Sequence, residues 1–307
     1  MQEDGTRRAI AAAFLANLGI AGAKFAGFFI TGAASMLAEA VHSLADTGNQ
    51  GLLILGAARA KREATLEHPF GFGRERYFWA FVVALVLFSL GSVFAIHEGV
   101  DKLLHPHEVV SPAVAICILA LAIAFESWSF RTAVVAARPV RGSMNWWSFI
   151  RRSKSPELPV VLLEDFGALL GLVIALAGVT LSAVFGDPRF DAIGSIGIGA
   201  LLGVIAIVLA VEMKSLLIGE SAAKEIRSAI RSTIEESPTV RRLIHMRTLH
   251  LGPDELLVAV KVEFVDAGLD IPGLASAIDD LESAIRQQTP TARVIYVEPD
   301  VIQSASG

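Results

Sequence analysis

The hydrophobic residues of this chain are concentrated in long blocks within its first two thirds. Each block has about 20 residues or more, the length that a helix needs to cross the hydrocarbon core of a bilayer. Polar loops separate the blocks, so the pattern predicts six membrane-spanning helices. They are expected at residues 9–31, 35–60, 77–100, 112–137, 160–185 and 192–217.

The last third of the chain has the hydrophobicity pattern of a soluble domain. Amphipathic periodicity predicts two helices, and alternation around turn residues predicts three strands, in the order αββαβ. The expected elements are helices at 222–237 and 271–288 and strands at 240–251, 256–265 and 292–297. This order is typical of a ferredoxin-like α+β fold, in which two helices cover one face of a sheet.

The chain is therefore expected to have two domains, a membrane all-α six-helix transmembrane bundle at 1–218 and a cytoplasmic ferredoxin-like domain at 219–307. A soluble domain as small as the second is only marginally stable alone. We therefore expect it to dock against a second copy in a homodimer.

Composition and charge support a membrane protein and narrow its partners. The chain is 53% hydrophobic and only 19% charged, more apolar than a typical soluble domain. Its net charge of −5 gives no reason to expect nucleic-acid binding. The single cysteine, Cys117, excludes an internal disulfide. Lys and Arg gather before the first block, after the second and after the fourth, which predicts that both termini are cytoplasmic. The expected location of this multi-pass protein is a bacterial plasma or inner membrane. A basic stretch with two tryptophans after the fourth block predicts a short interfacial helix.

The second hydrophobic block contains a group of polar residues that membrane insertion alone would disfavour. His42 and Asp46 are four residues apart, so on a helix they lie on one face. Glu39 lies one turn before them and Asn49 one turn after. Ionisable side chains at bilayer depth are costly and usually functional. An imidazole and a carboxylate in this arrangement could bind one divalent cation.

A further ligand is expected from the fifth block, which begins with the adjacent acids Glu164 and Asp165. On a helix their side chains diverge by roughly 100°. We assign Asp165 to the metal site, whereas Glu164 either caps the start of the helix or faces water. Glu126 in the fourth block is expected to form an ion pair with Arg131 or Lys24.

Several stretches resemble the cation diffusion facilitator family. They are MLAEAVHSLADTGNQ in the second block and HPFGFGRERYFW in the following loop, together with six expected spans and the αββαβ domain. VVLLEDFGALLG and GDPRFDAIGSIGIG further resemble the branch whose eukaryotic members are mitochondrial zinc-transporter-like proteins. The resemblance implies a homodimeric antiporter, not an enzyme, that exports Zn²⁺, or Fe²⁺, Mn²⁺ or Co²⁺, in exchange for protons. The cation is then the transported substrate, membrane lipid surrounds the protein, and no resident cofactor is implied.

The resemblance implies His42, Asp46 and Asp165 as metal ligands. Many relatives have a histidine four residues before the position of Asp165, and Val161 stands there in this chain. Water, Glu164 or Asn49 then remains as the fourth ligand, and Glu164 is also a candidate proton acceptor. A set richer in oxygen suits Mn²⁺ or Fe²⁺ better than a site with two histidines would.

Other histidines of relatives are also replaced. Phe72 stands in the loop after the second block where relatives often have histidine. In the cytoplasmic domain, Ile244, Lys261, Ala275 and Val297 stand where relatives with a metal pair have histidines. The sequence therefore gives no reason to expect a metal pair in that domain.

Two other functions could use the same polar residues. A membrane-embedded metal-dependent hydrolase would also need histidine and carboxylates at bilayer depth, but its H-E-x-x-H type of motif is absent from the sequence. A non-transporting metal sensor or scaffold would bind metal and a partner without moving either. Transport assays in vesicles separate these alternatives from an antiporter.

Overall fold

The computed structural model describes residues 18–265 and 270–300, and these form two compact units. The helical unit consists of the described residues up to Gly56 together with Phe78–Met213. The sheet unit consists of Ala57–Tyr77 and the described residues from Lys214 onward. The sequence analysis did not predict that segment 57–77, which includes the loop between two helices, belongs to the sheet unit. The predicted domain boundary between residues 218 and 219 stays a prediction.

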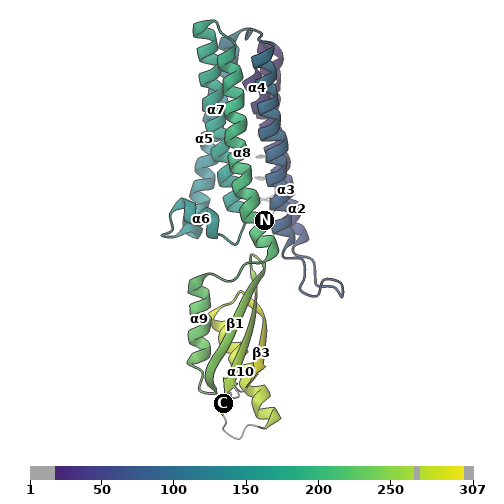
Figure 1. Ribbon diagram of the computed structural model, residues 1–307, viewed down its shortest axis with the longest axis vertical. Helices are drawn as coiled ribbons and strands as arrows, with labels where there is room; N and C mark the ends of the chain where they lie inside the picture. The colour runs from purple at the N-terminus through teal and green to yellow at the C-terminus, as the bar shows by residue number, and fades with distance from the viewer. Residues whose placement is uncertain (1–17, 266–269, 301–307) are drawn as a thin grey trace, which may run out of the picture. The chain divides into compact units, whose positions relative to one another are not determined.

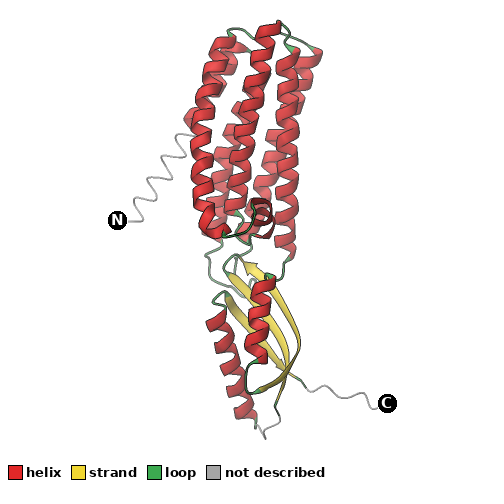
Figure 2. Ribbon diagram, turned by 90° about the vertical axis from the view of Figure 1, so that its left-hand side faces the viewer, coloured by secondary structure: helices red, strands yellow, loops and turns green. Residues whose placement is uncertain are grey.

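Among the described residues, four helical segments are long and apolar enough to cross a membrane. They are Glu75–Leu104, Pro112–Arg141 (α5), Glu157–Phe185 (α7) and Arg189–Ile218 (α8). The protein is therefore a multi-pass membrane protein, and its long helices run alongside one another in a bundle (Figures 1 and 2). These segments correspond to the third to sixth predicted spans.

The first two predicted spans are less clear-cut. The first is described only as the shorter apolar helix Leu18–Thr31, and its expected beginning at 9–17 lies outside the described residues. The second is the continuous helix α2, Ala34–Arg59, which has 26 residues and contains the polar residues predicted from the sequence. The count of six spans therefore stays a prediction.

Local sequence signals explain where several helices begin and end. Gly32 and Gly186, at the ends of the first helix and of α7, have φ angles of 65° and 66°, which glycine adopts without steric cost. Pro112 occupies the first turn of α5, where its missing N–H costs nothing. The short helix α6, Trp146–Arg152, is capped by the Asn145 side chain and lies in the stretch where a short helix was predicted.

The third apolar segment changes its helical geometry midway. It consists of α3 (Glu75–Val86), a π-helical stretch η1 (Leu87–Val93) and α4 (Phe94–Leu104). This segment packs closely against α8, because a Cβ atom added to Gly199 would lie 2.8 Å from the backbone oxygen of Ser92. The absence of a side chain at Gly199 therefore permits the approach of the two backbones.

The sheet unit contains helix α9 (Lys224–Glu235), strands β1 (Val240–Gly252) and β2 (Glu255–Phe264), helix α10 (Ile271–Gln288) and strand β3 (Ala292–Pro299). Strand β1 pairs antiparallel with β2, and β2 pairs parallel with β3, in the sheet order β1-β2-β3. The predicted order αββαβ is confirmed for the described residues. The finer assignment to a ferredoxin-like fold stays a prediction.

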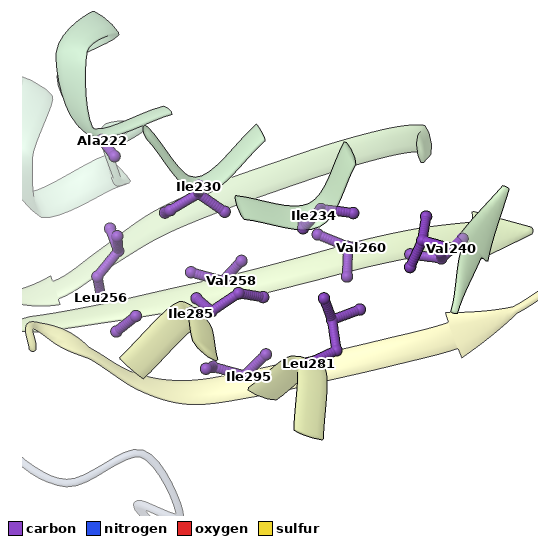
Figure 3. Packing of buried hydrophobic residues seen from close by; sticks show 12 residues of the cluster. Ala222, Ile230, Ile234, Val240, Leu256, Val258, Val260, Leu281, Ile285 and Ile295 are labelled. Carbon is purple, nitrogen blue, oxygen red and sulfur yellow. The ribbon is translucent and has the colours of Figure 1, made fainter. Parts of the chain in front are cut away.

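Both helices of this unit pack on one face of the sheet (Figure 3). Ile230 and Ile234 of α9 lie in the same buried cluster as Leu281 and Ile285 of α10. Strand β2 contributes alternate residues such as Val258 and Val260, as expected for a strand with one face in the core.

The loop 57–77 belongs to this unit because it packs on the turn between β1 and β2. A Cβ atom added to Gly73 would lie 2.7 Å from the backbone oxygen of Leu251. Arg76 donates a hydrogen bond of 3.0 Å to the Asp254 carboxylate. Within the loop, the ring of Phe72 stacks on His68 with 4.6 Å between centroids, and the Arg62 guanidinium lies 4.3 Å from the Phe72 ring.

Candidate metal site

Helix α2 positions His42 and Asp46 as their spacing predicts. The His42 Nε2 atom lies 3.4 Å from Asp46 Oδ2. His42 is fully buried, whereas the Asp46 side chain is 18% exposed. The two groups thus form a pair of nitrogen and oxygen donors on one face of α2.

Asn49 connects α2 to α7. Its side-chain amide donates a hydrogen bond of 2.7 Å to Glu164 Oε1, and both residues are buried. The alternative that Glu164 caps the start of its helix is wrong, because α7 begins at Glu157, about two turns earlier. Glu164 therefore lies inside the bundle and contacts the polar face of α2.

Asp165 contacts a different helix. Ser129 on α5 donates a hydrogen bond of 3.0 Å to Asp165 Oδ2. The structure thus separates the two adjacent acids as their helical divergence predicts, with Glu164 bonded to α2 and Asp165 to α5. The sequence analysis did not identify Ser129 as a partner of Asp165. The only signal in the sequence was that Ser129 is a polar residue close to Glu126 in the fourth apolar block.

The predicted ligands do not converge on one point. In the part of the chain that the structure describes, no three His, Cys, Asp or Glu side chains are grouped closely enough to hold a metal ion. Glu164, Glu126 and Asp165 are nevertheless the acidic groups that act electrostatically on Asp46. The arrangement thus consists of His42 and Asp46 on α2 with acidic side chains on α5 and α7 around them. The ligand set His42, Asp46 and Asp165 stays a prediction.

Several buried polar atoms of α2 are left without a hydrogen bond. Within the described residues, both ring nitrogens of His42, Asp46 Oδ1, Asn49 Oδ1 and Glu39 Oε1 have no such partner. Buried polar atoms are nearly always hydrogen-bonded, so a cluster of exceptions needs an explanation. These atoms are nitrogen and oxygen donors of the kind that bind zinc and other divalent transition metals.

Lys24 has a different partner from the one expected. Its ammonium group lies 3.1 Å from Glu39 Oε2 and donates a hydrogen bond of 2.6 Å to Ser43 Oγ. Lys24 thus pairs with Glu39 rather than with Glu126. This pair connects the first helix to α2 beside His42.

In the sheet unit, one of the positions where relatives have histidine forms ion pairs instead. Lys261 lies 2.9 Å from Asp300 Oδ2 and 3.0 Å from Glu298 Oε1. Hydrogen bonds to Asp300 and then Glu298 raise the pKa of Lys261. A cation in this position opposes metal binding. The absence of a metal pair from this domain stays a prediction.

Comparisons with known proteins identify a family for the helical part of the chain. Residues 10–218 match the model of the cation efflux transmembrane domain. The chain is 34% identical over 246 residues to the human protein named proton-coupled zinc antiporter SLC30A9, mitochondrial. That alignment covers 78% of this chain but 43% of the relative, so the chain spans less than half the length of this relative.

Shorter relatives align over more of their length. The cation-efflux pump FieF of Pectobacterium atrosepticum is 26% identical over 285 residues, which is 91% of this chain and 87% of the relative. The metal tolerance protein C4 of Arabidopsis thaliana is 28% identical over 266 residues, which is 86% of this chain and 58% of the relative.

Proposed function

The chain belongs to the cation efflux family, and we propose that it exports a divalent metal cation across a membrane in exchange for protons. The observation that carries this proposal is the cluster of buried, unpartnered donor atoms on α2, at His42, Asp46 and Asn49 in the described part of the bundle. A transported ion explains why costly polar atoms are kept at this depth without partners.

The proposed ligands are His42 and Asp46 of α2 and Asp165 of α7. Imidazole nitrogen and carboxylate oxygen suit Zn²⁺, and a set with more oxygen also suits Mn²⁺ or Fe²⁺. Two relatives are named as a zinc antiporter and a cation-efflux pump, which supports zinc as the first cation to test. We propose Asn49 or Glu164 as the fourth ligand. Their hydrogen bond joins α2 to α7, the two helices that carry the other ligands.

Proton coupling follows from the chemistry of these ligands. A carboxylate or imidazole must lose its proton to bind metal, so metal and protons compete for the same groups. After metal release, protonation of the Asp46 and Asp165 carboxylates lowers the cost of leaving them unpaired in the membrane. Glu164 is the proposed acceptor of one proton, and a proton gradient directed inward then drives metal export.

The remaining parts of the proposal concern assembly and orientation. We propose six spans, cytoplasmic termini and a homodimer in which the ferredoxin-like αββαβ domain contributes to the contact. The excess of Lys and Arg in alternate loops supports the orientation. Transport is preferred to hydrolysis because the sequence lacks an H-E-x-x-H motif and the family is one of cation efflux.

The test uses purified protein in vesicles that contain a pH-sensitive dye and a metal-sensitive dye. We expect a gradient of Zn²⁺, Mn²⁺ or Fe²⁺ to produce metal flux with opposite movement of protons, and reversal of the pH gradient to change the flux. Metal flux without proton movement would reduce the protein to a uniporter. Binding of metal without flux of any cation would leave the sensor or scaffold alternative.

A further inference from the structure

A buried charged pair lies beside the proposed metal ligands. Neither of its residues is a proposed ligand, and neither caps a helix end. Lys24 and Glu39 are both fully buried, with 3.1 Å between the ammonium nitrogen and Oε2. Lys24 also donates to Ser43 Oγ, so its head group bridges two successive turns of α2. A lysine buried this deeply inside a membrane bundle requires a specific role.

The position of this pair brings its charge to the metal site. Glu39 and Ser43 flank His42 along α2, and the Lys24 ammonium acts electrostatically on both His42 and Asp46. A cation fixed here opposes the entry of a divalent metal ion, because like charges repel strongly where water is scarce. The neighbouring carboxylate of Glu39 offsets that repulsion.

Only one of the two carboxylate oxygens of Glu39 contacts Lys24. Its Oε2 atom contacts Lys24, whereas Oε1 accepts no hydrogen bond from the residues that the structure describes. Helix α7 passes close to this free oxygen, since a Cβ atom added to Gly171 would lie 2.5 Å from it. The free oxygen therefore lies between α2 and α7, the helices that carry the proposed ligands.

We propose that the Lys24–Glu39 pair sets the affinity of the site for its divalent cation. Glu39 supplies an anionic group beside the ligands, and Lys24 limits its attraction for the metal so that the ion can leave again. Lys24 is thus a positioning residue that acts through Glu39 and does not bind the metal. This inference rests on the proposed function and adds the residues that tune it.

The proposal predicts opposite effects of the two single substitutions on metal binding. Glu39→Gln leaves the Lys24 cation uncompensated, and the Kd for Zn²⁺ should rise about tenfold or more. Lys24→Met leaves the Glu39 anion uncompensated, and the Kd should fall about tenfold while turnover slows because the ion is released more slowly. The double variant Lys24→Met with Glu39→Gln should return the Kd to within about threefold of the wild type. Lys24→Arg keeps the charge and should bind Zn²⁺ like the wild type.

The measurement is calorimetric titration of Zn²⁺ into the purified full chain in detergent, combined with flux in vesicles. The matched control is the buried pair of Lys102 and Asp191, whose nitrogen and oxygen lie 2.9 Å apart and whose side chains are also fully buried. Lys102→Met removes an equally buried charge, and it should lower thermal stability without shifting the Kd for Zn²⁺.

A purely structural role for Lys24 and Glu39 predicts a different pattern. The single variants would then lose stability with an unchanged Kd, or would shift it in the same direction, and either result overturns the proposal. If Lys24→Met alone does not fold, Glu39→Gln and the double variant decide, since the double variant must bind Zn²⁺ more tightly than Glu39→Gln. Failure of the wild type to bind any divalent cation would instead overturn the proposed function.

Discussion

Two clusters of buried charged residues in the helical unit differ in how fully their polar atoms are paired. In the first, called the Lys102–Asp191 cluster, Asp191 Oδ2 accepts hydrogen bonds from Lys102 at 2.9 Å and from the backbone of Ala34 at 2.8 Å. Ser35 donates to the other oxygen of Asp191, and Lys102 also donates to the Gly32 backbone oxygen at 3.0 Å. This cluster joins Gly32 and the first turn of α2 to α4 and α8, and both of its charges are paired.

The second, called the α2 cluster, consists of Glu39, His42, Asp46 and Asn49. Each of these four side chains keeps at least one buried nitrogen or oxygen atom without a hydrogen bond to any described residue. Burying an unpaired polar atom is costly, so folding alone does not favour the second arrangement. The paired cluster holds helices together, and the unpaired atoms of the α2 cluster are the reason why we propose a ligand there.

The largest expected effect is the loss of transport when a proposed carboxylate ligand is removed, either Asp46 in the α2 cluster or Asp165 on α7. Asp46→Ala and Asp165→Ala should each lower metal flux in vesicles by at least about 100-fold, the upper end of the effect of residues that only support metal ligands. Asp101→Ala, which removes a carboxylate that is 60% exposed, is the control and should transport normally. Near wild-type flux in either of the first two variants would contradict the proposed ligands.

Breaking the paired cluster should affect stability instead of binding. Lys102→Met leaves Asp191 buried without its ion pair, which typically costs roughly 3–5 kcal/mol. Thermal unfolding in detergent should show this loss, and the affinity for Zn²⁺ should not change in the protein that remains folded. A loss of Zn²⁺ affinity comparable to that of Asp46→Ala would remove the distinction between the two clusters.

A smaller effect is expected at the hydrogen bond that positions Asp165. Ser129→Ala removes the donor to Asp165 Oδ2 and should weaken Zn²⁺ binding by about tenfold, as expected for a group that orients a ligand. Ser89→Ala is the matched control, because the Ser89 hydroxyl donates only to backbone oxygens of its own helix. Equal binding by both variants would show that Ser129 does not orient Asp165.

The smallest effect is expected in the sheet unit, where the buried carboxylate of Glu263 pairs with two arginines that are about half exposed. Glu263 accepts hydrogen bonds from Arg242 at 2.7 Å and from Arg241 at 3.2 Å. The hydrogen bond from Arg242, more than any other interaction, lowers the pKa of Glu263 below its usual range. Its stabilisation is therefore present above the usual glutamate pKa and is lost as the pH falls through the lowered value.

Glu263→Gln should consequently lower stability near neutral pH and flatten the loss of stability on acidification, so that the variant and the wild type converge at low pH. Thermal unfolding of the full chain at a series of acidic pH values measures this difference. Because both arginines are about half exposed, the change should be small. Identical acid profiles for the variant and the wild type would contradict the role of this ion pair.

Much of the fold could be predicted from the periodicity of the sequence. The apolar blocks predicted the four long apolar helices, and α10 begins and ends at the predicted residues, Ile271 and Gln288. The error in α7 has a simple cause: the helix begins at Glu157, three residues before the predicted start, although Pro159 lies in this stretch. Proline usually signals the end of a helix, but it is tolerated in the first helical turn, where its missing N–H has no partner to lose.

The candidate site was predictable only within one helix. The spacing of His42 and Asp46 fixes their contact on α2, because both belong to the same rigid element. The pairs Asn49–Glu164, Ser129–Asp165 and Lys24–Glu39 each join two helices. Such pairs depend on the rotation of each helix about its own axis. The pattern of apolar residues does not define this rotation precisely enough to predict a hydrogen bond between two helices.

The most direct test of the account is to locate the bound ion. Crystals of the protein grown with Zn²⁺ and measured at the zinc absorption edge would show the metal as an anomalous difference peak. We expect the peak between α2 and α7, within ligand distance of His42, Asp46 and Asp165 (about 2.0–2.2 Å). A protein that carries stoichiometric Zn²⁺ with no peak at these residues would contradict the claim that the unpaired α2 cluster is the transport site.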